Sequence, residues 1–320
     1  MLGLKYVRQR ISTVSPYGES PQDRSIGDII PRSLVVIDKP SGPTSHQVSS
    51  WTQDICGMKA GHSGTLDPNV TGVIPMGIGH SVRVMDLLHS APKEYVVAIK
   101  FHNNVGKREI ASLVEDFTGE IYQMPPLRSG VKRRLRTRIV HEIEILDRAD
   151  NEYLLRVRCQ SGTYVRTLCK DMGKATGTGA HMMELRRTEA GGFVEDDCCT
   201  LQDLKDAFEF YEQGDASWLS ELLLPYERAL KLYPCIKVKD TAAGSILNGA
   251  DLAAPGILEA DHFEKNDQVV LYSTKGEGLA IGDAIYDAPE MIEKEEGLVV
   301  QTHRVFQPTG NYPRLWKEHK

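Results

Sequence analysis

At Leu223–Pro234 the sequence LLPYERALKLYP separates long periodic segments from a series of short β-branched runs. The runs CIKVKD, VVLYS, GLAIGDAIYD and GLVVQTHRVF follow in order, with glycine turns between them. Short strands in such a series are typical of a small β domain. A chain of 320 residues also has room for more than one hydrophobic core. We therefore expect two domains, the second a small, mostly β domain over residues 233–308.

The segments before this change predict both strands and helices. Leu34–Gly42 and Glu94–His102 contain β-branched runs that are typical of buried strands. In Tyr153–Cys159, four residues with apolar or aromatic side chains alternate with Leu154, Arg156 and Arg158, which indicates a strand with one buried face and one partly basic face. We expect Ser45 to be a helix N-cap, and Thr200–Asp203 resembles a capping box. The mixture predicts an α+β protein.

Charge is distributed unevenly along the chain. The formal net charge is −6, but residues 251–300 alone carry twelve acids and three bases. Leu127–Arg138 (LRSGVKRRLRTR) has six basic residues and no acid. Lysine and arginine clusters of this kind suit a nucleic-acid backbone, although most are simply solvated surfaces. The average charge therefore does not exclude an RNA partner.

Several classes of site are not supported by the sequence. The cysteines form no CxxC pair and no regular spacing with histidines, and we expect buried thiols rather than a disulfide or metal site. No HExxH, GxxxxGK[ST] or complete dinucleotide fingerprint occurs, so we expect no metal and no cofactor. No apolar run is long enough for a membrane span, and the first residues lack a signal-peptide pattern. We expect a cytoplasmic protein.

The loop GHSGTLDPNVTG (Gly61–Gly72) carries a single carboxylate, Asp67. Asp-Pro is a common turn pair, and on composition alone a turn role is favoured. However, the surrounding glycines permit close backbone approach to a ligand, and His62 lies in the same loop. A carboxylate held there is suited to nucleophilic or acid–base chemistry at a sugar carbon.

This loop resembles the catalytic-aspartate motif of the pseudouridine synthases of the bacterial tRNA T-loop type and of their archaeal and eukaryotic relatives, the dyskerin family. Other segments resemble further motifs of this group in the same order: DKPSGPTSH, KEYVVAIKFH, GTYVRTL and GAHMMELRRTEAGGF. The resemblance implies a catalytic domain with a mixed, mainly antiparallel central sheet, followed by a PUA pseudo-barrel. It implies an N-terminal arm over residues 1–32 that packs on the PUA domain, a catalytic domain over 33–232, the PUA domain over 233–308 and a tail over 309–320.

The resemblance also implies the chemistry. Such enzymes break the C1′–N1 bond of uridine, turn the uracil and rejoin it through C5, without a cofactor. Asp67 would be the essential carboxylate, either attacking C1′ or removing the 2′ hydrogen. Arg187 matches the residue that pairs with this carboxylate and keeps it ionised. Tyr95 matches the tyrosine that packs on the flipped base and helps to remove the C5 proton.

Further residues match the substrate pocket. Tyr164 and Arg166 would share one face of a strand and line the same cleft, and Leu168 would form an apolar wall for the base. We expect Lys39 to contact the RNA as well. His62 corresponds to a residue that supports RNA distortion, although a neutral turn histidine is the alternative.

The basic run resembles the thumb loop that clamps substrate RNA, with Arg128, Lys132, Arg133 and Arg134 as contacts. We expect neutralising Lys132, Arg133 and Arg134 together to weaken RNA binding broadly and to reduce the slope of affinity against salt concentration. An unchanged slope would contradict this assignment.

The PUA domain would bind the lower stem and 3′ ACA of an H/ACA guide RNA, with Gly249 and Ala250 in the contact. The family also implies a small zinc-ribbon-bearing protein, a small β-barrel protein near the thumb loop and a kink-turn-binding ribosomal-type protein. The expected function is isomerisation of guide-selected uridines in rRNA, and of the tRNA T-loop uridine as a further substrate. The alternatives are a stand-alone tRNA pseudouridine synthase and a non-catalytic RNA-binding scaffold for ribosome assembly.

Overall fold

The structure is a computed structural model that describes residues 5–10, 15–125, 132, 134–308 and 312. It divides into two compact units, one formed by residues 1–34, 77–84 and 216–320 and the other by 35–76 and 85–215. The expected limits at 32, 232 and 308 stay a prediction. None of the helices in the described residues is long and apolar enough to cross a membrane.

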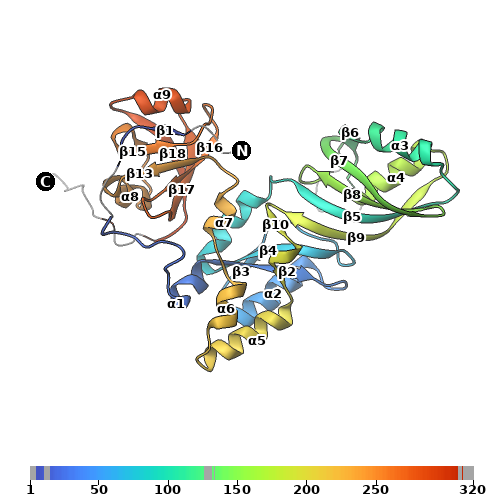
Figure 1. Cartoon of the computed structure of the whole chain (residues 1–320), viewed down its shortest axis with the longest axis horizontal. Coiled ribbons are helices and arrows are strands. Elements are labelled where there is room, and N and C mark those ends of the chain that lie inside the picture. Colours follow the sequence, from blue (N-terminus) through green and yellow to red (C-terminus); the bar gives the residue numbers. More distant parts are fainter. Residues whose placement is uncertain (1–4, 11–14, 126–131, 133, 309–311, 313–320) are drawn as a thin grey trace. The chain divides into compact units, whose positions relative to one another are not determined.

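The unit that contains the C-terminal segment is built on a seven-stranded sheet (Figure 1), in the order β1-β15-β13-β16-β17-β18-β14. Its strands are β1 (Tyr6–Val7), β13 (Cys235–Val238), β14 (Leu252–Ala253), β15 (Ile257–Ala260), β16 (Gln268–Tyr272), β17 (Gly278–Ala284) and β18 (Leu298–Val305). Its helices are α1 (Ile26–Ile29), α6 (Ser217–Leu222), α7 (Glu227–Leu230), α8 (Asp240–Leu247) and α9 (Ala288–Glu293), with 3₁₀ turns η1 (Ile30–Arg32) and η4 (Ala254–Gly256). The pairing of β13 with β16 is parallel, and the others in this sheet are antiparallel.

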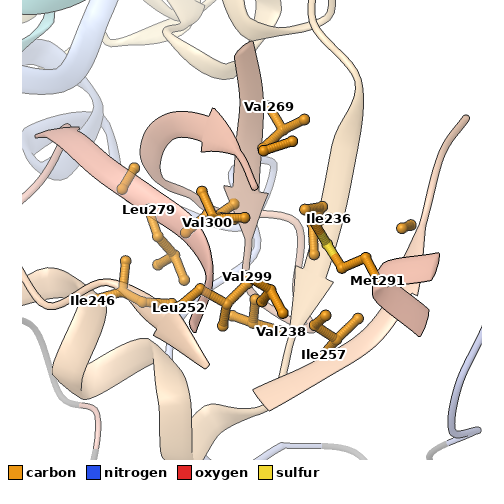
Figure 2. Close-up of a cluster of buried hydrophobic side chains, with 14 of the residues drawn as sticks. Ile236, Val238, Ile246, Leu252, Ile257, Val269, Leu279, Met291, Val299 and Val300 are labelled. Carbon is orange, nitrogen blue, oxygen red and sulfur yellow. The ribbon is translucent and has the colours of Figure 1, made fainter. Parts of the chain in front are cut away.

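Apolar side chains from these strands and from α8 and α9 form one buried cluster, shown in Figure 2. The labelled members are Ile236, Val238, Ile246, Leu252, Ile257, Val269, Leu279, Met291, Val299 and Val300. The N-terminal segment joins the same sheet, because β1 pairs with β15 and the Arg8 N–H donates to the Leu258 carbonyl at 2.8 Å. The small β domain predicted after the change of pattern therefore has its own core.

The other unit carries most of a larger mixed sheet, in the order β11-β2-β4-β9-β5-β8-β7-β6. In addition, β3 pairs with β4, β10 with β9 and β12 with β2. The strands are β2 (Ser33–Lys39), β3 (Ala60–His62), β4 (Thr71–Ile78), β5 (Lys93–Phe101), β6 (Gly119–Gln123), β7 (Arg136–Ala149), β8 (Glu152–Cys159), β9 (Ala180–Ala190), β10 (Phe193–Val194), β11 (Cys198–Cys199) and β12 (Leu224–Pro225). The helices are α2 (Ser45–Cys56), α3 (Lys107–Asp116), α4 (Val165–Ala175) and α5 (Leu201–Glu212), with the 3₁₀ segment η3 (Glu195–Asp197). The 3₁₀ segment η2 (Gly79–Leu88) is divided between the two units.

This sheet confirms the predicted α+β class. The ladders β5–β8, β5–β9, β6–β7 and β7–β8 are antiparallel, whereas β4–β9 and β2–β11 are parallel. The alternation predicted for Tyr153–Cys159 is confirmed, because its odd-numbered residues are buried in β8. They pack with the inner residues of β5 and with α4 in one hydrophobic cluster.

Helix starts follow the local sequence with one correction. The capping box predicted at Thr200–Asp203 is present at the start of α5. At α2 the N-cap is Thr44, whose hydroxyl accepts from the Gln47 N–H, and not Ser45 as predicted. Ser45 is the first helical residue, because its hydroxyl bonds to the backbone of Leu66 instead.

Candidate active site

Asp67 lies in the turn between β3 and β4, with its side chain 57% exposed. Its neighbours Leu66 and Val70 are buried, which turns the carboxylate outward. The Val70 N–H donates to the Asp67 carbonyl at 3.0 Å, and the Ser45 hydroxyl accepts from the Leu66 N–H at 2.8 Å. The turn expected from Asp-Pro therefore forms through the backbone and leaves the side chain available for another role.

Lys39 holds the other side of this loop. Its ammonium group donates to the carbonyls of Pro40, Pro68 and Val70 at 2.8, 2.9 and 2.8 Å. The residue is fully buried, and burial, followed by the charge of Arg187, lowers the pKa of its ammonium group. The structure thus places Lys39 inside the fold and not on the RNA-facing surface that we expected, because backbone carbonyls take up its donors.

Replacing Lys39 with methionine tests this anchoring role. Lys39→Met keeps the apolar stem but leaves buried carbonyls without a donor, so we expect the free energy of unfolding to fall by about 2–4 kcal/mol. The control is Lys100→Met, because the side chain of Lys100 is 40% exposed and its ammonium group forms an ion pair with Glu152. That variant should lose less than about 1 kcal/mol. Equal losses in urea titrations of the two variants would contradict the anchoring role.

Arg166 forms an ion pair with the Asp67 carboxylate. Both side chains are more than half exposed, so the pair contributes little to stability and separates easily when a ligand competes. We expected this pairing from Arg187, and the structure gives it to Arg166. The shared strand face predicted for Tyr164 and Arg166 is also wrong, because α4 begins at Val165.

Arg187 lies on β9 beside the loop and is 1% exposed. Its Nε donates to the Val73 carbonyl at 2.7 Å and its Nη2 to the Gly64 carbonyl at 3.2 Å. Burial lowers the pKa of Arg187, and a hydrogen bond with Tyr95 acts in the opposite direction. A guanidinium stays charged in such settings, so Arg187 places a fixed cation under the start of the Asp67 loop.

Tyr95 lies on β5, where it is paired with Arg187 of β9 and Val157 of β8. The side chain is partly buried. Burial raises the pKa of its phenol, while the neighbouring Arg187 lowers it, and the net shift is upward. Tyr95 is therefore a neutral phenol at pH 7, within hydrogen-bonding reach of the buried guanidinium.

His62 is held on both ring nitrogens. Nδ1 lies 2.8 Å from the Ser49 hydroxyl, and Nε2 lies 3.4 Å from the Thr65 hydroxyl. The ring contacts His46 edge-on at 5.1 Å between centroids. Burial, followed by the charges of His46 and Arg187, lowers the pKa of His62 to about 4. The imidazole is neutral at pH 7, and the role of His62 in RNA distortion stays a prediction.

This lowered pKa predicts a pH dependence of stability. Between pH 6.5 and 4 the unfolded chain binds a proton at His62 that the folded chain does not, so stability falls as pH falls through this window. Relative to His62→Gln, which does not titrate, the wild type should lose about 2 kcal/mol between pH 7 and pH 4.5. Urea unfolding of both proteins at the two pH values measures the difference. Parallel pH profiles would show that His62 is not held neutral.

Tyr164 and Leu168 lie on the same helix as Arg166 but in different surroundings. Tyr164 is the N-cap of α4, where the Gln123 side chain accepts from its N–H at 2.9 Å. Leu168 is 1% exposed and belongs to the hydrophobic cluster under the sheet. The role of Leu168 as a wall for the base stays a prediction.

The structure describes only some of the residues that we predict as RNA contacts of the thumb loop. Arg128 and Arg133 lie outside the described residues. Lys132 and Arg134 are both exposed, before the start of β7. The role of these residues as RNA contacts stays a prediction.

Lys93 was missed as a site residue in the sequence, although it opens the motif KEY. It is 4% exposed, and burial, followed by the charge of Arg187, lowers the pKa of its ammonium group to about 8. A Cβ on Gly64 would lie 3.6 Å from Arg187 Nη1 and 3.9 Å from Lys93 Cε, so two cations converge under the Asp67 loop. The ammonium group donates to the carbonyls of Leu88, His89 and Ala91.

In the C-terminal sheet, Gly249 and Ala250 follow the end of α8 on the surface. Gly249 has φ +89°, and a Cβ there would meet no atom within 4 Å. The Ala250 carbonyl accepts from the Thr302 hydroxyl at 3.1 Å. The turn is therefore fixed to β18 and open to solvent, and its contact with RNA stays a prediction.

Comparison with known proteins extends across the chain. Residues 53–165 match the TruB family pseudouridylate synthase (N terminal domain), and 166–231 match the tRNA pseudouridylate synthase B C-terminal domain. Residues 5–49 match the DKCLD (NUC011) domain and 234–306 the PUA domain. The curated relative from Methanocaldococcus jannaschii, a probable tRNA pseudouridine synthase B, is 44% identical over 98% of this chain and 94% of its own length. The one from Methanothermobacter thermautotrophicus, of the same name, is 45% identical over 98% of both chains.

Solved structures agree with these relatives. A chain in the crystal structure of a Cbf5-Nop10-Gar1 complex has a TM-score of 0.94 and 40% identity, covering 98% of this chain and 97% of its own. A chain in an H/ACA RNP bound to a substrate RNA containing 2′-deoxyuridine has a TM-score of 0.93 and 38% identity, covering 99% and 98%. The predicted resemblance is confirmed at the level of sequence, domain order and fold. The chain belongs to the TruB family and is an RNA pseudouridine synthase, an isomerase, with a C-terminal PUA domain.

Proposed function

We propose that Asp67 is the carboxylate that carries out the isomerisation. The observation that supports this most is its placement: an exposed carboxylate on a loop that Ser45 and Lys39 fix on both sides. A rigid loop holds the reacting group in position before substrate arrives, which lowers the entropic part of the barrier. Arg166 and the buried Arg187 supply positive charge around the carboxylate and its loop.

Two routes are open for the first step. In one, the Asp67 carboxylate attacks C1′ and the C1′–N1 bonding pair leaves with uracil. In the other, it removes the 2′ hydrogen as a proton, and loss of the same bond gives a glycal. In both, uracil turns and C5 bonds to C1′. In the first route the bond between Asp67 and C1′ breaks as this bond forms, and in the second route Asp67 returns its proton to C2′. The C5 proton is then lost and N1 ends protonated. The reaction is redox-neutral and needs no phosphate donor.

We assign Tyr95 to the base and Arg166 to the substrate backbone. A neutral phenol at Tyr95 is suited to pack on uracil and to relay the C5 proton. Because the Arg166–Asp67 pair is exposed and weak, a substrate phosphate can compete for the guanidinium and leave Asp67 free to react. Arg187 stays in place as a fixed cation, since its donors are bound to the carbonyls of Gly64 in the loop and Val73 in β4.

We further propose that the target uridine is selected by an H/ACA guide RNA. Everting a uridine from a duplex costs a few kcal/mol, and a guide that presents it unpaired reduces this cost. The similar chains come from assemblies titled Cbf5-Nop10-Gar1 and H/ACA RNP with substrate RNA, which supports the guided function. We place this activity in the cytoplasm, with the turn at Gly249–Ala250 on the guide RNA.

An apolar surface on β6 and β7 supports the proposed small β-barrel partner near the thumb loop. Tyr122, Leu135 and Ile139 are 62%, 60% and 43% exposed, although β6 and β7 are paired here. Tyr122 is paired with Thr137, and Ile139 lies two residues further along β7, so the side chains of Tyr122 and Ile139 share a face of the ribbon. Leu135 directly precedes β7. Exposed apolar side chains gathered on one face are typical of a protein-binding surface. The zinc-ribbon-bearing and kink-turn-binding partners are part of the same proposal.

The names of the archaeal relatives favour tRNA as a second substrate, and the family resemblance suggests its T-loop uridine. Tritium release from C5-labelled uridine distinguishes the two. The protein is assayed on a bare T-loop RNA and on an rRNA fragment with its matched guide, each with and without the partner proteins. We expect release from the fragment to require the guide. Release from the T-loop RNA alone would establish the stand-alone activity, and no release under any condition would favour the scaffold.

A further inference from the structure

The candidate site lies beside a short ladder between two neighbouring strands of the catalytic sheet, β4 and β9. In the described residues, β4 and β9 pair in parallel through Thr71 opposite Arg186 and Gly72 opposite Arg187. The neighbouring ladder between β5 and β9 runs from Lys93 to Phe101. We call the β4–β9 junction the seam. Few backbone hydrogen bonds therefore fix the distance across it.

The proposed catalytic groups come from opposite sides of the seam. The loop that carries Asp67 leads directly into β4, whereas Arg187 is on β9 and Tyr95 on β5. Because a displacement of about 1 Å between reacting groups can reduce a rate a hundredfold, the separation across the seam must be controlled. Because the β4–β9 ladder is short, side-chain contacts must help to fix this separation.

Asp38 and Arg186 supply such a connection. The two Nη atoms of Arg186 donate to the two carboxylate oxygens of Asp38 at 2.9 and 3.0 Å. Since β4 lies between β2 and β9 in the sheet, this contact spans β4 and joins its two neighbours. A bidentate pair fixes orientation as well as distance, which a single hydrogen bond does not.

Both partners are adjacent in sequence to residues that hold the Asp67 loop. Asp38 precedes Lys39, whose ammonium group binds the carbonyls on the far side of Asp67. Arg186 precedes Arg187, whose guanidinium binds Gly64 at the start of the loop. A movement of β2 relative to β9 would therefore pull on both ends of the loop.

We infer that Asp38 is a positioning residue: with Arg186 it fixes the separation between the Asp67 loop and the strands that carry Arg187 and Tyr95. This inference rests on the proposed function of Asp67. The pair itself is about one-third exposed, at 35% for Asp38 and 36% for Arg186. A pair this exposed adds little to global stability, which allows a positioning role to be separated from a structural one.

The test compares Asp38→Asn with a matched variant away from the seam. Glu152→Gln breaks the Lys100–Glu152 pair, which has a similar exposure of 40% and 39% and an N–O distance of 2.7 Å but joins β5 to β8. We expect Asp38→Asn to lower the single-turnover rate of isomerisation about tenfold, with RNA affinity within twofold of wild type. Glu152→Gln should leave both unchanged, and Asp38→Glu should recover part of the rate.

A second control tests whether the contact between Asp38 and Arg186 matters, rather than any ion pair that Arg186 forms. Glu195 also forms an ion pair with Arg186, but it follows β10, which pairs with β9 and not with β2. Glu195→Gln should therefore retain the single-turnover rate. A wild-type rate in Asp38→Asn, or an equal loss in Glu195→Gln, would overturn the inference.

Hydrogen exchange gives a readout that does not depend on the assignment of Asp67. In Asp38→Asn we expect amides at Thr71–Val73 and Arg186–Thr188 to exchange at least several-fold faster, while amides of β8 keep their rates. Unchanged exchange at the seam would overturn the inference even if activity fell. Faster exchange at the seam with full activity in Asp67→Asn would instead show that the proposed function fails while the bridge exists.

Discussion

Asp67→Asn is expected to lower the single-turnover rate of isomerisation by at least about a thousandfold. Asparagine has nearly the same shape as aspartate, but it can neither attack C1′ nor accept the 2′ proton. The fold should be preserved, because the carboxylate is 57% exposed and its pair with Arg166 is in solvent. The rate is measured by tritium release with enzyme in excess over C5-labelled RNA, so that product release does not limit it.

The matched control is Asp54→Asn, another exposed acid in the same unit, on α2. This change should leave the rate and the RNA affinity at their wild-type values. Asp67→Asn should bind RNA at least as well as wild type, since it removes a negative charge near the phosphates. A loss of rate explained by lost RNA binding, or retained turnover in Asp67→Asn, would contradict the proposed role of this carboxylate.

Sequence patterns predicted those parts of the fold that depend on neighbouring residues. The buried face of β8 follows from alternation within one strand, and the start of α5 follows from Thr200 and Asp203, three residues apart. The loop with Asp67 was identifiable for the same reason, since its glycines and its single acid lie within one short stretch of sequence. Local hydrogen bonds and periodicity decide such features.

The partners of the charged site residues could not be predicted in this way. Lys39 is buried because three carbonyls, two of them about thirty residues further on, converge on its ammonium group. Arg166 reaches Asp67 only because α4 begins at Val165, and Gln123 holds the backbone at that start. Local spacing in GTYVRTLCKDMGKATG is helical, but it does not show at which residue the helix begins or which acid Arg166 meets.

Gly72→Ala is expected to have the largest effect on stability. Gly72 has φ +103°, and a Cβ there would lie 2.2 Å from the Arg187 carbonyl oxygen and 2.9 Å from its nitrogen. Backbone atoms cannot move aside as a flexible side chain can, so β4 and β9 must separate at the seam. We expect a loss of at least about 3 kcal/mol in the free energy of unfolding, together with loss of activity.

Gly42→Ala separates the cost of this steric clash from the cost of placing alanine at a positive φ. Gly42 has a similar φ of +113°, but a Cβ there would meet no atom within 4 Å. Its replacement therefore measures the cost of the left-handed conformation alone, about 1 kcal/mol. The difference between the two variants in urea unfolding reports the close approach of β4 to β9. If both variants lost the same free energy, the seam would tolerate a wider spacing, and the close approach of β4 to β9 would not contribute to stability.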